Sequence, residues 1–264
     1  MQIVLDEKYC AKSSVLALGM FDGVHIGHRV LLERAAHLAK KRGVPLVVCT
    51  FQQHPLQVIA PEKCPPMLAT AEERNQLMEA LGVDVLCAMP FTRDVMDMLP
   101  EEYVGHLVRR FHPVAVVCGY NHTFGKKGQG TPALLEALGA ALGFETSIVP
   151  KITLGEQDVS SSVIRGLLAN GNVDLARTLL ARPYEHSAKL LSREGSKCTL
   201  QLLEEGKQML PEGSYRSFLC DEEHAYPVLL HIKADGTACC MLPHAAALGN
   251  TLCLQYWCNL SIKF

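Results

Sequence analysis

Two histidines three residues apart are the first side chains in this chain that are suited to chemistry. They stand in the segment GMFDGVHIGH, residues 19–28, as His25 and His28. On the first turn of a helix this spacing places both imidazoles on one face. The start of a helix also attracts phosphate through its unpaired N–H groups and its partial positive charge. Gly19 and Gly23 let the backbone turn tightly and approach a ligand. The segment therefore predicts a phosphate site, and the alternative is a surface turn with two solvated histidines.

Three later segments also carry side chains that suit a ligand. Phe51, His54 and Pro55 follow an apolar run, and residues 118–125, CGYNHTFG, follow another. The segment SSSVIR at 160–165 offers hydroxyls at a helix start and an arginine, which can grip a polyphosphate with two charge-assisted hydrogen bonds. Taken alone, each also fits a structural role: a turn ended by proline, a glycine-rich surface loop, and a helix cap with an exposed arginine.

The elements that must position these segments alternate up to about residue 183. Short apolar runs predict strands at 15–18, 45–51, 83–89, 114–119 and 146–149. Amphipathic stretches predict helices at 27–42, 71–81, 101–111, 131–142, 160–169 and 173–180. Strand–helix alternation predicts an α/β fold, with a parallel sheet covered by helices on both faces. Such sheets bind ligands beyond the carboxyl ends of their strands.

The pattern changes after residue 184. Apolar runs then lie at 199–203, 215–219, 227–232 and 252–257, separated by Glu-Gly, Pro-Glu-Gly and Asp-Gly turns. Short strands joined by such turns indicate a small antiparallel β-barrel-like domain. We therefore expect an α/β domain over residues 1–184 and a β domain over residues 185–264.

Composition and charge exclude several classes of partner. The 264 residues include 25 Lys+Arg and 27 Asp+Glu, and 48% are hydrophobic, which indicates a packed globular protein. This balance argues against broad binding of nucleic acid or an anionic membrane. No apolar run approaches the ~18 residues that a membrane span needs, and we see no secretory signal, so a cytoplasmic location is expected. The sequence gives no indication of the oligomeric state.

The eleven cysteines lie mostly in apolar runs, and no Cys-x-x-Cys pair is present. We interpret them as free, buried thiols in a reducing compartment. A loose metal cluster of Cys239, Cys240, Cys253 and Cys258 is the less favoured alternative.

The four segments together resemble a known family. The HxGH at residues 25–28 is similar to the signature of the nucleotidyltransferase superfamily. The whole string at 19–28 resembles the FAD synthetase domain of bacterial bifunctional riboflavin kinase/FAD synthetases. The later matches, in the family's order, are FQQHP at 51–55, CGYNHTFG at 118–125 and VSSSVIR at 159–165, with Ser162 in place of threonine. The resemblance covers about residues 14–184 and implies a Rossmann-like sheet.

The resemblance also implies an activity and a set of site residues. The reaction is AMP transfer from ATP to FMN, with Mg²⁺ bridging phosphate oxygens and few dedicated protein ligands. The phosphate-binding and catalytic residues are expected to be His25, His28, Ser161 and Arg165. The other expected ATP- or flavin-binding residues are Gly19, Phe21, Asp22, Gly23, Phe51, His54, Pro55, Gly119, Asn121, Phe124, Gly125, Ser160 and Ser162.

The chain also departs from the family. Thr131 stands where the family usually has a carboxylate, His122 replaces an aromatic residue, and Ala181 replaces glycine in L-G-R-P-Y. The family's kinase domain binds ATP phosphates through a P-T-A-N segment, which is missing here. The corresponding stretch at 192–205, SREGSKCTLQLLEE, suits a plain strand. We therefore expect a reduced kinase-like domain without riboflavin kinase activity.

Three alternatives stay open at this point. One is an adenylyltransferase that uses another phosphorylated acceptor. Another is a non-catalytic sensor of flavin or nucleotide. The third is retained riboflavin kinase activity.

Overall fold

The computed structural model divides the chain into two compact units. The described residues are 1–6, 8–203, 206–243, 246, 248–249 and 251–260. The first unit comprises Met1–Pro65 and Ala71–Asp158, and the second comprises Pro66–Thr70 and Val159–Phe264. The expected boundary after residue 184 falls at the start of the first barrel strand, at Tyr184, whereas the compact units divide between Asp158 and Val159, because the helices at Ser161–Ala169 and Val173–Leu180 group with the barrel. That this boundary separates two functions stays a prediction.

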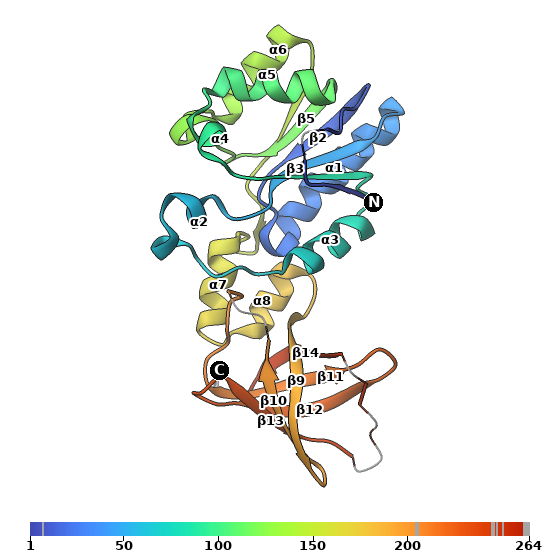
Figure 1. Ribbon diagram of the computed structural model, residues 1–264, viewed down its shortest axis with the longest axis vertical. Coiled ribbons are helices and arrows are strands. Elements are labelled where there is room, and N and C mark those ends of the chain that lie inside the picture. Colours follow the sequence, from blue (N-terminus) through green and yellow to red (C-terminus); the bar gives the residue numbers. More distant parts are fainter. Residues whose placement is uncertain (7, 204–205, 244–245, 247, 250, 261–264) are drawn as a thin grey trace. The chain divides into compact units, whose positions relative to one another are not determined.

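The first unit is built on a six-stranded parallel sheet with the order β1-β4-β3-β2-β5-β6 (Figure 1). The strands are β1 (Gln2–Val4), β2 (Ser14–Leu18), β3 (Leu46–Phe51), β4 (Val85–Met89), β5 (Pro113–Gly119) and β6 (Glu145–Val149). Every residue of β2 and β4 is buried, as expected for parallel strands covered on both faces. The predicted parallel sheet is thus confirmed, and β1 is an additional short strand at its edge.

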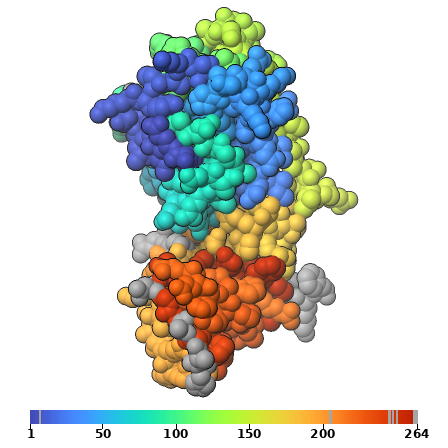
Figure 2. Space-filling model, turned by 90° about the vertical axis from the view of Figure 1, so that its right-hand side faces the viewer, coloured from blue at the N-terminus to red at the C-terminus, as the bar shows by residue number. Residues whose placement is uncertain are grey.

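Helices cover both faces of this sheet (Figure 1). The α-helices are α1 (Ile26–Arg42), α2 (Pro55–Ile59), α3 (Ala71–Ala80), α4 (Arg93–Asp97), α5 (Pro100–Phe111) and α6 (Pro132–Leu142). Short 3₁₀ turns lie at η1 (Asp22–Val24), η2 (Pro61–Lys63) and η3 (Lys126–Gly128). A small hairpin of β7 (Thr153–Leu154) and β8 (Gln157–Asp158) projects from the surface, yellow-green in Figure 2.

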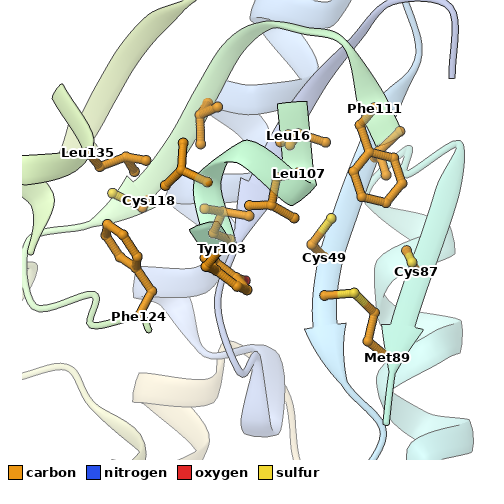
Figure 3. Close-up of a cluster of buried hydrophobic side chains, with 14 of the residues drawn as sticks. Leu16, Cys49, Cys87, Met89, Tyr103, Leu107, Phe111, Cys118, Phe124 and Leu135 are labelled. Atoms are coloured by element: carbon orange, nitrogen blue, oxygen red, sulfur yellow. The ribbon is translucent and has the colours of Figure 1, made fainter. Parts of the chain in front are cut away.

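Alternate residues of β2 divide the hydrophobic core into two clusters, because successive side chains of a strand point to opposite faces. Val15 belongs to a cluster with Leu32 of α1 and Met78 of α3. Leu16 belongs to a second cluster, drawn in Figure 3, which includes Leu107 of α5. The sheet is therefore held rigidly between two helical layers, and its strand ends have fixed positions.

The second unit contains two helices and a closed antiparallel barrel. The helices are α7 (Ser161–Ala169) and α8 (Val173–Leu180). The barrel order is β10-β13-β12-β11-β14-β9. Its strands are β9 (Tyr184–Glu194), β10 (Lys197–Leu202), β11 (Gly213–Cys220), β12 (Ala225–Ile232), β13 (Thr237–Met241) and β14 (Leu252–Asn259). The expected antiparallel barrel is confirmed, and β9 and β13 are strands that the sequence analysis did not identify.

Helix α8 contacts the barrel at strand β14. The guanidinium of Arg177 lies 4.5 Å from the centroid of the Trp257 ring. The side-chain amide of Asn259 donates a hydrogen bond of 3.0 Å to the Gly171 carbonyl. These contacts explain why α7 and α8 belong to the same compact unit as the barrel.

All eleven cysteines are free, and five are buried: Cys49, Cys87, Cys118, Cys198 and Cys240. Cys10 is exposed and the other five are half-buried, so the interpretation as buried thiols holds for only part of the set. Within the described residues, no helix is both long and apolar enough to cross a bilayer.

Candidate active site

The segment that carries the two histidines connects β2 to α1 through a strained turn. Phe21 and Val24 both adopt left-handed backbone angles, with φ of 53° and 42°. Such angles are costly for residues with a Cβ and tend to gather at functional sites. The Phe21 ring is fully buried, and a Cβ on Gly19 would lie 3.1 Å from it. A side chain at position 19 would therefore force the Phe21 ring to shift by a few tenths of an ångström.

His25 caps the helix that this turn leads into. Its Nδ1 accepts a hydrogen bond of 3.3 Å from the backbone N–H of His28. The two imidazoles are stacked, with ring centroids 3.7 Å apart and an interplanar angle of 16°. The prediction that both rings lie on one face of the first turn is thus confirmed.

His28 is held as a neutral imidazole. Burial lowers its pKa well below 6.5, and the neighbouring His25 lowers this pKa further. Its Nδ1 is buried and has no hydrogen-bond partner within the described part of the chain. An unpaired buried nitrogen costs free energy in the unliganded protein. This atom therefore lacks the partner that a buried polar group normally has.

A cavity of about 340 Å³ opens beside His28 at the carboxyl ends of four sheet strands. The strand ends are marked by Leu18, Phe51, Met89 and Gly119, from β2, β3, β4 and β5. This is the edge at which parallel sheets bind ligands. The predicted site residues that line it are Gly19, His28, Phe51, Pro55, Gly119 and Asn121.

A second cavity, of about 480 Å³, adjoins the first and is mainly apolar. The two cavities share five lining residues, namely Phe51, Pro55, Tyr103, His122 and Thr123. In the second cavity, the rings of Phe51 and Phe91 meet edge to face at 4.9 Å. The predicted Phe124 and Gly125 line only this second cavity. Together the cavities form a polar compartment beside His28 and an apolar compartment beyond it.

The glycine-rich loop after β5 is shaped by close contacts. Phe124 and Gly130 are paired by two backbone hydrogen bonds of 3.2 and 2.8 Å. A Cβ on Gly130 would lie 2.4 Å from the Phe124 ring. Thr131 caps α6, because its Oγ1 accepts a hydrogen bond of 3.2 Å from the Leu134 N–H. The hydroxyl that replaces the family's carboxylate thus has a structural role here.

Five predicted residues of the first unit line neither cavity, and one of them is His25, the cap of α1. His54 caps α2, since its Nδ1 accepts a hydrogen bond of 3.1 Å from the Leu56 N–H. Asp22 is buried within η1, and its charge raises the pKa of Arg74 against the larger, lowering effect of burial. The others, Phe21 and Gly23, form the strained turn. Ligand contacts by these residues stay predictions.

The predicted phosphate-binding serines and arginine belong to the second unit. Ser160 caps α7, with its Oγ accepting a hydrogen bond of 3.3 Å from the Val163 N–H. Ser161 and Ser162 form the first turn of this helix. Arg165 donates from Nε to the Pro66 carbonyl at 2.7 Å. The helix cap is therefore as expected, and binding of phosphate by this group stays a prediction.

Sequence analysis missed Met89, Phe91 and Tyr103 as cavity residues. Tyr103 lies on α5 within an amphipathic pattern that is typical of a core helix, and it is indeed buried. Phe91 follows β4 in a segment without any recognised motif. Only the positions of Met89 and Phe91, at and just after the carboxyl end of β4, could have indicated a role at the site.

Comparison with known proteins places the chain in a family. The family model described as FAD synthetase matches residues 7–163. The chain belongs to the FAD synthetase family. This membership confirms the family expected from the four segments, and the FAD synthetase match includes both histidines and both cavities.

Curated relatives in the FAD synthetase family are longer than the matched region. The bifunctional riboflavin kinase/FMN adenylyltransferase of Bacillus subtilis (strain 168) is 36% identical over 173 residues, which cover 65% of this chain and 54% of the relative. The protein of the same description from Escherichia coli (strain K12) is 30% identical over 178 residues, covering 67% and 57%. The chain thus spans just over half the length of the curated relatives it matches.

A solved structure supports the fold along the whole chain. The structure described as a macrolide-efflux protein from Streptococcus pneumoniae matches with a TM-score of 0.86 and 23% sequence identity. The matched region covers 98% of this chain and 90% of the Streptococcus pneumoniae chain. At this identity the likeness shows the fold alone.

Proposed function

We propose that this chain is an FMN adenylyltransferase, which transfers AMP from Mg-ATP to the phosphate of FMN and releases pyrophosphate. The observation that carries the proposal is the stacked pair of His25 and His28 at the start of α1, with the unpaired Nδ1 of His28 beside the smaller cavity. Membership in the FAD synthetase family supports it, as do relatives whose description includes FMN adenylyltransferase.

The two cavities suit the two ends of FMN. The larger cavity is lined by Phe51, Phe91 and Ile59, and aromatic and aliphatic side chains are suited to a flat flavin ring. The smaller cavity contains His28 and the start of α1, which are suited to phosphate groups. The flavin would therefore lie with its ring in the larger cavity and its phosphate toward His28.

In the proposed reaction, an FMN phosphate oxygen forms a bond to the α-phosphorus of ATP. The bond from that phosphorus to the bridging oxygen breaks, and its electron pair leaves with pyrophosphate. The attacking oxygen is already anionic, so no strong general base is needed. His25, His28 and the N-terminal end of α1 would position the phosphates and stabilise their charge. Because the pKa of His28 is low, its neutral ring acts as a hydrogen-bonding group in the unliganded enzyme.

Magnesium enters this scheme with the nucleotide. In the described residues, no group of three or more His, Cys, Asp or Glu side chains is arranged to hold a metal ion. In nucleotide sites Mg²⁺ is held largely by substrate phosphates and water. We therefore assign no side chain as a metal ligand. The roles proposed for Ser161, Ser162 and Arg165, binding the β,γ end of ATP, rest on the family resemblance.

We also propose that the barrel does not phosphorylate riboflavin. The stretch at 192–205 contains the end of β9, a two-residue turn and the strand β10, while Glu204 and Glu205 lie outside the described residues. Strand β10 pairs with β9 on one side and β13 on the other. Its backbone groups are used in these ladders, which leaves little backbone for a phosphate cradle.

The proposal includes a cytoplasmic location, which the free thiols favour. The test is to incubate the full chain with Mg-ATP and either FMN or riboflavin and to separate the flavins by chromatography. We expect FAD from FMN and no FMN from riboflavin. If no FAD forms above a protein-free control at high protein concentration, the enzyme proposal is wrong, and flavin binding without turnover would then indicate a sensor.

A further inference from the structure

His122 lies where the two cavities meet, since it lines both of them. Its ring is stacked on Phe124, with centroids 5.8 Å apart and an interplanar angle of 24°. Phe124 is in turn stacked on Tyr103 at 5.8 Å and 30°. This row of three rings fixes the orientation of the imidazole at the junction.

The Nε2 atom of His122 is buried and has no hydrogen-bond partner within the described part of the chain. Burial lowers the pKa of His122 to about 4, so the ring is neutral at pH 7. Leaving a buried polar atom unpaired costs stability, whereas an apolar ring of similar shape would avoid that cost. A partner is therefore most readily supplied by a ligand that fills the cavities.

We propose that His122 is a specificity-determining residue, which hydrogen-bonds through Nε2 to a polar atom of the flavin where the ring joins the ribityl chain. This inference rests on the proposed function. If the ring lies in the apolar cavity and the phosphate lies at His28, the junction between them must pass the lining residues that both cavities share.

Two kinds of flavin atom lie at this junction. One is a ribityl hydroxyl, and the other is a nitrogen or carbonyl oxygen on the ring edge next to the ribityl chain. A neutral imidazole has one N–H and one lone pair, so it can pair with either kind. Lumiflavin, which has the ring but a methyl group in place of the ribityl chain, distinguishes them.

The test measures dissociation constants of FMN and lumiflavin by flavin fluorescence, without ATP, for the full chain and its variants. His122→Phe keeps the ring stack and removes Nε2, and we expect FMN to bind roughly tenfold more weakly, which corresponds to about 1.4 kcal/mol. His122→Gln restores a polar atom, so part of the affinity should return. The matched control is His106→Phe, because His106 is half-buried on α5 and lines neither cavity.

Thermal unfolding of the unliganded variants separates this role from a merely structural one. Since His122→Phe removes an unpaired buried nitrogen, its melting temperature should equal or exceed that of the unsubstituted chain. A stable variant with weak flavin binding is the signature of a ligand-binding residue. If the larger phenyl ring prevents folding, His122→Leu replaces it in the same test.

The measured affinities for FMN and lumiflavin show which flavin atom pairs with His122. Weaker binding of FMN alone assigns the hydrogen bond to the ribityl chain, and weaker binding of both flavins assigns it to the ring edge. Equal affinities of the His122→Phe and unsubstituted chains for both flavins would overturn this inference alone. Absence of FMN binding to the unsubstituted chain would overturn the proposed function itself.

Discussion

The imidazole rings of His25 and His28 are nearly parallel, and their centroids lie 3.7 Å apart. His25 also caps α1, the helix that carries His28. The cap fixes His25, and the stack then fixes the ring of His28 beside the cavity. Burial lowers the pKa of His28, and the neighbouring His25 lowers this pKa further, so the His28 ring stays neutral in the unliganded chain. Under the proposed function, both rings are therefore already positioned before phosphate binds.

The substitution His28→Ala tests this arrangement. Loss of a preorganised donor to the reacting phosphates should lower kcat for FAD formation on the order of 10²–10³-fold, with little change in FMN affinity. Chromatographic assay of FAD measures the first quantity, and flavin fluorescence measures the second. His37→Ala is the matched control, because His37 is exposed on the same helix. Nearly normal turnover in His28→Ala would mean that the ring has no part in the reaction.

Stability should depend on His122 as pH falls. Its pKa is about 4 in the folded chain, below the ordinary value of about 6.5. Between these values the unfolded chain binds the proton more readily, so the folded state loses stability as pH drops below about 6.5. At pH 5 the loss attributable to His122 is roughly 2 kcal/mol.

Urea unfolding at pH 7.5 and pH 5.0 measures this effect. His122→Phe should lose less free energy of unfolding between the two pH values than the unsubstituted chain does. Carboxylates contribute equally to both proteins and cancel in the comparison. An identical loss in both proteins would contradict the low pKa of His122.

Gly125→Ala should destabilise the loop that lines the apolar cavity. Gly125 has a φ of +68°, and a Cβ there would lie 2.8 Å from backbone atoms of Pro100. Gly82→Ala is the matched control, since Gly82 has a φ of +78° and open space around it. The control should cost about 1 kcal/mol through backbone strain. Gly125→Ala should cost about 1–3 kcal/mol more through overpacking.

Urea unfolding of the two alanine variants gives these free energies directly. FMN affinity should fall in Gly125→Ala and remain normal in Gly82→Ala. Equal stabilities of the two variants would show that the loop moves away from Pro100 at no cost.

Arg165→Ala tests the role that the family resemblance gives to this arginine. If the guanidinium binds the polyphosphate end of ATP, ATP affinity should fall about tenfold or more while FMN affinity is kept. Isothermal titration with a non-hydrolysable ATP analogue measures the first quantity. Arg165 also donates to the Pro66 carbonyl, so a parallel loss of both ligands would instead indicate damage to the fold.

Much of the sheet could be predicted from sequence because its strands are continuous apolar runs. All five predicted strands of the first unit correspond to observed ones. Strand β1 has only three residues with two exposed side chains, so it carries no clear hydrophobic pattern. The short helices α2 and α4 have five residues each and bury none of them. Periodicity cannot reveal an element of little more than one turn.

The site was predictable only where its residues lie in motifs. His28, Asn121 and Phe124 stand in recognised segments and line the cavities. Phe91 reaches the apolar cavity by tertiary packing that no local pattern encodes. For His54 the motif did not reveal the structural role of its Nδ1, which caps α2, and the ligand contact expected from the motif stays a prediction.

Trp257 is the single tryptophan of the chain, and it lies on β14 beneath the guanidinium of Arg177. Its intrinsic fluorescence therefore reports on the barrel unit alone, with emission that is sensitive to separation of α8 from the barrel. Under the proposed function, quenching of a bound flavin would report on the other unit. Tryptophan fluorescence and flavin fluorescence, recorded in one denaturation experiment, would thus follow the unfolding of the two units independently.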